Sequence, residues 1–330
     1  RIYSGKHFGE VLDVYDPLLR AKLPNEYRYY EYLGEKNSLT VFGHVVYSFP
    51  IGLHLVGDVQ LQKHDWLLDQ ELIGHATGHK LNATWPFLNP RFGFSYNISD
   101  HISVFGNYGT AEKEPSDSQI IEADDVWAEP KEVASEKIFD KEAGINLLYI
   151  NKYLKINLYR IDYHNEILSD IYDFAEGKFD IQSADKTRHE GIEIEGGCEV
   201  NQSLAIRFNG SWSFNKFKDG DFVGKILANV PAKLANVTID YSSNKLFGLM
   251  LYGKYVGNQY IDEANAPDLV IEPYIILNLS GWLQYDQIRV TARINNLFDT
   301  LYATYGYEYY GGYYWPGATR NVSLSVEIQI

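Results

Sequence analysis

Aromatic residues are concentrated in one short segment near the C-terminus, "YATYGYEYYGGYYW" at residues 302–315. Flat rings stack on flat or unsaturated ligands such as sugars, catechols and porphyrins, and tyrosine adds a hydroxyl group at a low cost in side-chain entropy. The alternative is an exposed loop that glycine and tyrosine make stiff. We predict a ligand-binding loop whose contacts come from Tyr305, Tyr307, Tyr309, Tyr310, Tyr313, Tyr314 and Trp315.

Two further stretches could contact a ligand. The stretch "HDWLLDQELIGHATGH" (64–79) contains His75 and His79, and the acidic stretch 112–132 contains Trp127. Imidazole can hold a metal or a haem iron, but loop histidines are more often solvated, so we expect no metal site and no cofactor. We predict His75, His79 and Trp127 as ligand contacts. No nucleophile stands beside a base in a recognisable motif, so we do not expect an enzyme.

The composition bears on the partners and on the fold. The 330 residues carry a formal charge of −15, which argues against nucleic acid or anionic lipid as the main partner. Cys198 is the one cysteine, so the chain has no internal disulfide. No run approaches the roughly 18 to 20 apolar residues of a membrane-spanning helix. The chain begins at Arg1, and we expect a mature product or a piece of a longer chain.

The elements that position these residues are strands, because apolar and polar residues alternate in run after run. We expect strands of about 10 to 14 residues around these runs, long enough to cross a membrane at a tilt. We predict about thirteen strands, and one or two more in residues 7–34. The alternating runs lie at 37–49, 53–61, 92–96, 102–108, 143–149, 154–158, 192–200, 204–214, 235–241, 247–251, 275–279, 288–294 and 321–330.

The connections between these strands alternate between short and long. Tight turns are predicted at 49–52, 98–101, 150–153, 200–203, 242–245 and 285–288, and long loops at 65–85, 110–136, 166–186, 216–231, 257–272 and 299–317. A β-sandwich rarely separates its connections so cleanly, whereas an up-and-down barrel in an outer membrane has short turns at its periplasmic end and long loops outside. The last strand then runs toward the periplasm, which places the C-terminus there.

The two faces of the strands favour the same architecture. Charged and polar residues such as Asp58 and Arg207 share one face, and the other face is apolar with aromatic residues near the strand ends. A wide membrane barrel turns its apolar face to lipid and its polar face to a wet lumen. Arg160 resists this pattern, because its alternation with Leu158 would place it in lipid. We expect a bulge, a position above the lipid, or another register there.

The C-terminal segment 293–330 contains a series of residues in a characteristic order. A strand ends in Asn-Leu-Phe-Asp, and a tyrosine, an aromatic loop, Pro-Gly, an arginine and an amphipathic strand follow. This order resembles the closing segment of TonB-dependent outer-membrane receptors. Residues 87–116, 189–213 and 229–241 resemble further stretches of the same family, in the same order. The family motif residues are Asn296, Leu297, Phe298, Asp299, Tyr302, Pro316, Gly317 and Arg320.

The resemblance implies an all-β fold, a transmembrane antiparallel up-and-down β-barrel, of which residues 1–330 form the C-terminal portion. It implies about 22 strands in the whole barrel, of which this chain supplies about fourteen, and a plug domain that this chain lacks. Its partners would be outer-membrane lipid, the missing plug and strands from the same gene or another chain, TonB acting through the plug, and a small-molecule ligand. The final residue, Ile330, departs from the phenylalanine that is usual in the family.

The function that the resemblance implies is import of a bulky, scarce nutrient across the outer membrane of a Gram-negative bacterium. The nutrient would be a ferric siderophore, haem, cobalamin or an oligosaccharide, captured at the extracellular loops. One alternative is a self-closed, porin-like barrel for passive diffusion. Another is a soluble, β-rich binding protein. We favour completion by further strands, because an unpaired sheet edge in lipid costs several kcal/mol for each unsatisfied backbone group.

Overall fold

The computed structural model describes residues 1–23, 27–74, 76–121, 129–173, 178–243 and 246–328. Fourteen strands form one antiparallel sheet in the order β1 to β11, β14, β15 and β18, which confirms the predicted fold class and the number of strands. Neither helix among the described residues is long and apolar enough to cross a membrane. The elements are β1 (Ile2–Val11), α1 (Pro17–Arg20), β2 (Tyr27–Ser48), β3 (Leu53–Ile73), β4 (Lys80–Ser99), β5 (Ile102–Lys113), α2 (Asp117–Ile120), β6 (Glu136–Tyr149), β7 (Lys152–Asp173), β8 (Lys178–Asn201), β9 (Leu204–Phe217), β10 (Lys233–Ser243), β11 (Phe247–Val256), β12 (Gln259–Tyr260), β13 (Val270–Ile271), β14 (Tyr274–Tyr285), β15 (Ile288–Asn295), β16 (Ala303–Glu308), β17 (Gly312–Pro316) and β18 (Asn321–Ile328).

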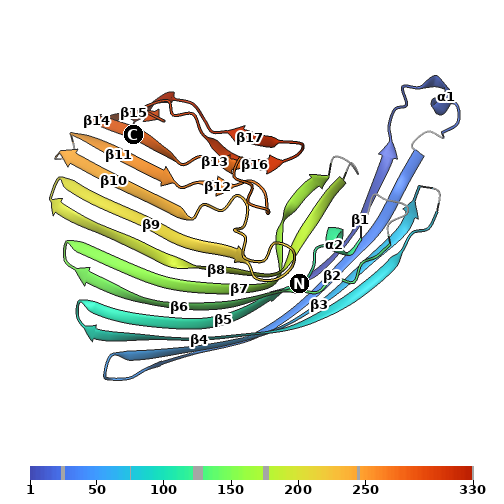
Figure 1. The fold of residues 1–330 in the computed structure, drawn as a ribbon, viewed down its shortest axis with the longest axis horizontal. Coiled ribbons are helices and arrows are strands. Elements are labelled where there is room, and N and C mark those ends of the chain that lie inside the picture. Colours follow the sequence, from blue (N-terminus) through green and yellow to red (C-terminus); the bar gives the residue numbers. More distant parts are fainter. Residues whose placement is uncertain (24–26, 75, 122–128, 174–177, 244–245, 329–330) are drawn as a thin grey trace.

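The sheet curves into a wall whose neighbouring strands are consecutive along the chain, apart from the small hairpins β12–β13 and β16–β17 (Figure 1). Five of the six predicted tight turns lie at one end of this wall, between β2 and β3, β4 and β5, β6 and β7, β8 and β9, and β14 and β15. The sixth, at 242–245, lies partly outside the described residues, and the strands that flank it, β10 and β11, pair at the same end through Ser243 and Phe247. We call this the short-turn end and the opposite one the long-loop end. The C-terminal strand β18 runs to the short-turn end, because Ile328 pairs with Ile288 beside the β14–β15 turn.

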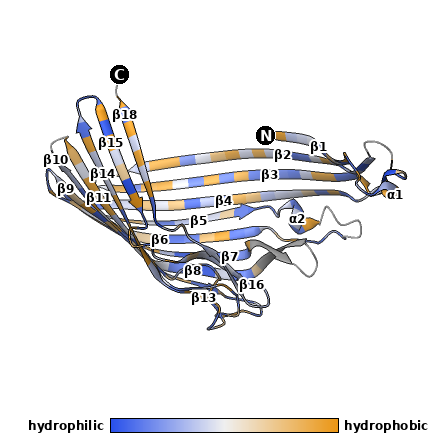
Figure 2. Ribbon diagram, turned by 90° about the horizontal axis from the view of Figure 1, so that it is seen from above, coloured by the Kyte–Doolittle hydropathy of each residue, from blue (hydrophilic) through white to orange (hydrophobic). Residues whose placement is uncertain are grey.

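One face of the wall is apolar and uncovered across its middle. We call it the outward face; it carries Leu61, Leu88 and Leu249, which are 54%, 53% and 49% exposed. Hydrophobic and hydrophilic residues alternate along β2, β3 and β4 in Figure 2. A soluble sandwich would bury such side chains in its core, because burial of apolar area drives its folding. This face therefore requires an apolar solvent, as the membrane prediction states.

The opposite, inward face is polar and its side chains bond to one another across strands. Asn157 donates through Nδ2 to Glu142 Oε2 at 3.3 Å and to Glu193 Oε2 at 3.4 Å. Asn236 Nδ2 donates to Asn209 Oδ1 at 2.8 Å. Asn157, Glu193, Asn209 and Asn236 line a hollow of about 360 Å³ that spans β5 to β10. The polar residues are thus on the side toward which the wall closes, as expected for a wet lumen.

The polarity of the two faces reverses toward the long-loop end of β3 and β4. Beyond Leu61, the outward positions become Lys63, Asp65 and Asp69, and the inward positions become apolar, with Trp66 and Leu68 8% and 7% exposed. The paired strand β4 follows the same change, since Trp85 and Phe87 face inward there. We call the part of β2, β3 and β4 beyond this level the extension. The predicted long loop at 65–85 was wrong, because regular strand continues to Ile73 and resumes at Lys80.

The extension has a small core of its own on the inward side. Tyr32, Trp66, Leu68 and Ile73 form a buried cluster with Ile121, which follows α2. The segment that contains α2 therefore folds back against the inner side of the wall. Glu114 fixes its start, because its carboxylate accepts hydrogen bonds from His64 Nδ1 at 2.9 Å and from Lys36 Nζ.

A second predicted loop, 166–186, is also mostly strand, because β7 continues to Asp173 and β8 begins at Lys178. Arg160 remains on the outward face without a bulge beside it, since β7 and β8 pair in continuous register from Lys152 to His164. It lies beside Lys141 and Glu190 in the register, and Asp162 accepts from its Nε at 3.0 Å. The charged neighbours show that Arg160 is above the apolar band, which is one of the outcomes expected from the sequence.

The sheet is open in this chain. The edge strands β1 and β18 each pair with one neighbour, β2 and β15, and not with each other. The described residues therefore do not form the self-closed barrel of the porin-like alternative. The predicted departure at Ile330 lies outside the described residues.

Candidate ligand-binding site

Three connections meet at the long-loop end of β9 to β15, and two asparagines tie them together. Asn265, between β12 and β13, accepts from Ile226 N at 2.7 Å and donates to Ile226 O at 2.8 Å. Asn229 donates to Gly306 O at 2.9 Å and accepts from Gly306 N at 3.0 Å. Both asparagines have positive φ, 56° and 57°, a conformation that asparagine tolerates better than most residues. The hairpin β16–β17 is thereby fixed to the wall.

Residue 306 must be glycine, because the junction has no space for a Cβ atom. A Cβ atom added there would lie 2.7 Å from Ile261 Cγ2 and 2.9 Å from Tyr313 O. Both contacts are too short for a real side chain, so the hairpin backbone reaches Ile261 and Asn229 only because residue 306 is glycine.

The predicted aromatic segment forms the hairpin β16–β17, and its rings contact one another. Tyr307 and Tyr313 are stacked, with ring centroids 5.2 Å apart and an interplanar angle of 17°. Trp315 contacts both Tyr305 and Tyr307, with centroids 5.3 and 5.0 Å apart. The hairpin is thus a prearranged aromatic surface, which lowers the entropy lost when a flat ligand stacks on it.

Tyr305 and Tyr307 line a hollow of about 330 Å³ between the hairpin and the wall. Its other polar side chains include Glu166, His189, Asp262, Glu263 and Glu308. His189 Nε2 lies 3.0 Å from Glu166 Oε1, and Glu166 also accepts a hydrogen bond from Thr187 Oγ1. The hollow therefore combines aromatic rings with an excess of carboxylates, an arrangement that favours ligands bearing hydrogen-bond donors or positive charge.

Burial changes the acidity of two groups in this hollow. It raises the pKa of the Glu263 carboxyl above its ordinary value, and the charge of Asp262 adds to the rise. Burial also raises the pKa of the Tyr305 hydroxyl, with Glu263 adding to the effect. Tyr305 thus keeps its proton and offers a hydrogen-bond donor to a ligand. Among the described residues, no group of three or more His, Cys, Asp or Glu could hold a metal ion.

The structure divides the predicted contact residues into several groups. Tyr305 and Tyr307 line the hollow, whereas Tyr309, Tyr310, Tyr313, Tyr314 and Trp315 belong to the same hairpin and do not line it. His79 lies at the β3–β4 tip, where its N donates to Gln70 Oε1, and this tip is far from β16–β17 (Figure 1). His75 and Trp127 lie outside the described residues.

Glu166, His189 and Asn229 were missed from the sequence. Asn165 has a φ of 55°, which interrupts the alternation of β7 and turns Glu166 inward to Thr187 and His189. Strict alternation from the outward residue His164 would instead place residue 165 inward and Glu166 outward. The sequence did contain a local signal for this change, namely Asn165 itself, because asparagine adopts positive φ more often than any residue type other than glycine.

The family motif residues build the base of the same connection. Asn296 is 3% exposed, and its side chain donates to Thr300 O and Ala318 O and accepts from Thr300 N. Asp299 Oδ1 accepts from Arg320 N at 2.7 Å. A Cβ on Gly317 would meet the Tyr302 ring at 2.1 Å, so only glycine fits. The motif therefore positions the hairpin and does not itself line the hollow. Leu297, Phe298 and Pro316 complete this base, with Leu297 N donating to Leu277 O.

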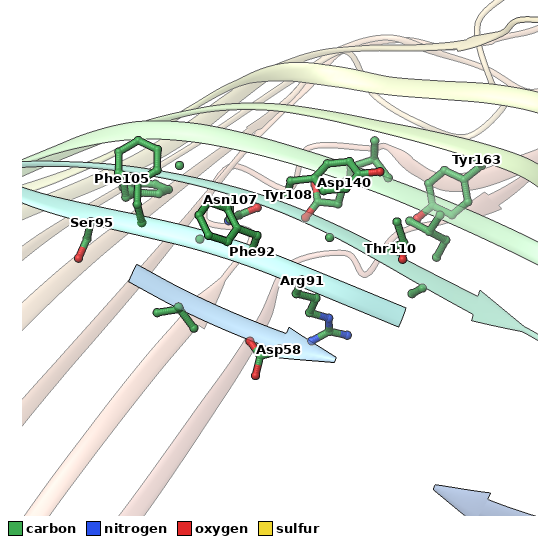
Figure 3. A pocket seen from close by; sticks show the side chains of 18 residues that line it. Asp58, Arg91, Phe92, Ser95, Phe105, Asn107, Tyr108, Thr110, Asp140 and Tyr163 are labelled. Atoms are coloured by element: carbon green, nitrogen blue, oxygen red, sulfur yellow. The ribbon is translucent and has the colours of Figure 1, made fainter. Parts of the chain in front are cut away.

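A larger hollow of about 650 Å³ lies along β3 to β7 (Figure 3). Asp58, Arg91 and Asp140 give it charge, and Phe92, Phe105 and Tyr108 give it rings. It is a shallow part of the wall that no described segment covers, so we regard the hollow beside the hairpin as the better ligand site.

The chain belongs to the family of TonB-dependent receptors. The family model "TonB dependent receptor-like, beta-barrel" matches residues 4–297, which confirms the family inferred from the sequence motifs and places the chain in a bacterial outer membrane.

Similar proteins and structures support the same fold. The iron-regulated outer membrane virulence protein of Vibrio cholerae serotype O1 is 24% identical over 138 residues, which cover 40% of this chain and 21% of that protein. The ferric yersiniabactin uptake receptor FyuA from Yersinia pestis superposes with a TM-score of 0.73 at 18% identity, and the match covers 92% of this chain and 47% of the FyuA chain. The ferric citrate transporter FecA superposes with a TM-score of 0.73 at 13% identity, and the match covers 91% of this chain and 46% of the FecA chain. This chain thus spans less than half the length of these structures.

Proposed function

We propose that this chain forms part of the wall of an outer-membrane receptor that imports an iron–siderophore complex. The observation that carries the proposal is the prearranged aromatic hairpin beside a hollow, because stacking surfaces suit the flat chelating groups of such ligands. The relatives named for ferric complexes or for regulation by iron favour iron over haem, cobalamin or an oligosaccharide.

The chemistry is non-covalent. Tyr305 and Tyr307 stack on the ligand, and His189 and Glu308 contact its polar groups. The polar inward face then offers hydrogen-bond partners along the path through the lumen. No bond of the ligand is broken in this scheme, which agrees with the expectation that the chain is not an enzyme.

We also propose that the long-loop end faces the outside and that the C-terminus lies in the periplasm. Outer-membrane barrels have short periplasmic turns and long external loops, and the tight turns share the end to which β18 runs. An epitope inserted between Tyr310 and Gly311 should be reached by antibody on intact cells. The same epitope inserted after Ile150 should be reached only after lysis. The reverse result contradicts this orientation.

Strands and a plug from outside residues 1–330 complete the receptor in this proposal. The edges β1 and β18 present unpaired backbone groups, and such groups cost several kcal/mol each in lipid. Further strands between these edges would satisfy them. The plug would then close the lumen, and TonB would act on the plug and not on this wall.

Uptake of radioactive iron by iron-starved cells tests the proposal. Deletion of the gene should abolish uptake of iron bound to one siderophore, and the wild-type gene should restore it. The pair Y305A/Y307A should restore at least about fivefold less uptake, because each lost stacking contact is worth roughly 0.5–1.5 kcal/mol. Tyr310→Ala, at a ring that is 92% exposed and outside the hollow, is the matched control and should restore full uptake.

Unchanged iron uptake in the deletion strain would overturn the ligand class. Equal uptake by Y305A/Y307A and wild type would overturn the site alone. Immunoblots and the heat-dependent mobility of the barrel on gels confirm that each variant is folded and present at an equal level.

A further inference from the structure

The outward face carries a concentration of basic side chains at the upper margin of its apolar band. Lys141, Arg160, Lys186, Arg188, Lys216 and Lys218 come from β6, β7, β8 and β9 and from the residue after β9; we call them the basic patch. The strand register brings them together, because Lys141 pairs with Arg160, and Arg188 pairs with both Asp162 and Lys216. This concentration is unusual in a chain with a net charge of −15.

The patch has more positive charge than its own carboxylates neutralise. Asp162 accepts from Arg188 Nε at 2.6 Å and from Arg160 Nε at 3.0 Å, so the terminal N–H groups of both arginines remain available. Lys186 lies 3.6 Å from Asp219, and Glu190 is beside Arg160 in the register. Among the described residues, Lys141, Lys216 and Lys218 form no ion pair.

The patch surrounds a shallow hollow that two aromatic rings also line. The hollow has a volume of about 390 Å³ and is lined by Lys141, Lys186, Arg188 and Lys218 with Tyr108 and Phe139. Below this level, the outward residues are Ala143, Leu158 and Ile192, which are apolar or small. The basic groups are therefore at the height of headgroups, and Tyr108 and Phe139, which pair with Lys141 and Asp162, are at the same level beside them.

The same margin lacks such a surplus on β2 and β3. On β2 and β3 the outward residues just above the band are Glu35, Asn37, Lys63 and Asp65, and Lys63 Nζ lies 2.8 Å from Asp65 Oδ1. Charged residues that only marked the end of the membrane would be spread along the whole wall. Their concentration on β6 to β9 points to a particular bound group.

We propose that the basic patch binds the phosphate groups of a phosphorylated glycolipid in the outer leaflet. Arginine forks and lysine ammonium groups are the side chains that recognise phosphate, and basic clusters beside membrane-spanning segments bind anionic headgroups. The lipid would be fixed to the wall of the barrel, on the side away from the lumen and the imported ligand. This inference rests on the proposed orientation of the long-loop end, and not on the identity of the ligand.

Native mass spectrometry of the receptor extracted from outer membranes tests the proposal. The receptor is stripped of lipid by detergent exchange and then titrated with a glycolipid that carries two phosphates. The triple variant K141Q/K216Q/K218Q removes the three unpaired lysines and leaves the Asp162 ion pairs intact. We expect the wild type to bind the glycolipid and the triple variant to bind it at least about tenfold more weakly.

The control K63Q/K80Q/K155Q loses the same number of positive charges elsewhere on the wall, at lysines paired with Asp65, Asp69 and Glu195, and should bind like the wild type. Removal of both phosphates from the glycolipid should weaken binding to the wild type to the level of the triple variant. Equal binding by the wild type and the triple variant would overturn the proposal, and so would equal binding of the phosphorylated and dephosphorylated glycolipids. Antibody access to the epitope at Tyr310 is scored in the same cells, so a reversed orientation is recognised separately from a failure to bind lipid.

Discussion

The apolar band and the extension are built from the same strands and obey opposite rules. In the band, β3 turns Val59 and Leu61 outward and Gln60 and Gln62 inward. In the extension, the same strand turns Asp65 and Asp69 outward and buries Trp66 and Leu68 inward. Strand geometry does not change between the two, so the difference reports the solvent on each side. Hydrocarbon is outside the band, whereas water is outside the extension.

The two regions also differ in what stabilises them. The band has few side-chain contacts of its own on the outward face, where Leu61 is 54% exposed, and depends on lipid to cover it. The extension has a protein core, Tyr32, Trp66, Leu68, Ile73 and Ile121, that α2 helps to cover. The extension should therefore keep its packing in water, and the band should keep its packing only in lipid or detergent.

Removal of a core ring from the extension should have the largest effect on stability. Trp66→Ala deletes a side chain that is 8% exposed and leaves a cavity beside Leu68 and Ile121. Such a change costs about 3–5 kcal/mol. Hydrogen exchange should show loss of amide protection in the extension and in α2, with the band protected as before. Leu67→Ala, on the outward side of the same strand, is the control and should cost less than about half as much. Equal losses would mean that the extension has no inward core.

A charge placed in the band should have the next largest effect. Leu251 is near the middle of β11 on the outward face, and Leu251→Arg should destabilise the receptor by roughly 2–4 kcal/mol in lipid vesicles. The inward control, Asn209→Arg, should change stability by less than about 1 kcal/mol, because that side chain lies in water and loses only its hydrogen bond from Asn236. Urea-induced unfolding followed by tryptophan fluorescence measures both values. A tolerated arginine at 251 would contradict a lipid-facing band.

These comparisons explain how much of the molecule the sequence could predict. The alternation of the band and the tight turns could be predicted, because lipid on one side and water on the other imposes period 2. The extension could not, since Trp66, Leu68, Trp85 and Phe87 alternate in the opposite phase and the segment was interpreted as a loop. Arg160 was a further sign in the sequence that the strands extend beyond the membrane, because charge on the outward face marks the end of the band.

The candidate site could be predicted only in part. Tyr305 and Tyr307 were found because the aromatic segment is local in sequence. Glu166 was missed because Asn165 reverses the alternation of β7. The contact of Glu166 with His189 joins residues 23 positions apart, and that of Asn229 with Gly306 joins residues 77 positions apart. Neither follows from a pattern within one strand.

The contact of α2 with the extension should depend weakly on pH. Burial raises the pKa of Glu114, but the hydrogen bond from Lys36, with help from His64, outweighs it, and the pKa lies below its ordinary value of 4.5. A lowered folded-state pKa means that the contact is fully stabilised above about pH 4.5 and is lost as the pH falls through the folded pKa. The protection factors of the amides of residues 114–121, taken relative to the intrinsic exchange rate at each pH, should therefore fall at acidic pH. Glu114→Gln should remove this dependence, and a wild-type profile that is flat in acid would contradict it.

Spin labels placed one at a time along β3 test the reversal of polarity most directly. The account predicts that outward labels at residues 59 and 61 collide with dissolved oxygen more than with a water-soluble nickel chelate. It predicts the opposite preference at the outward residues 65 and 69, and low access to both reagents at the inward residue 68. A label at residue 61 that meets the nickel chelate as freely as one at residue 69 would contradict the membrane-facing band.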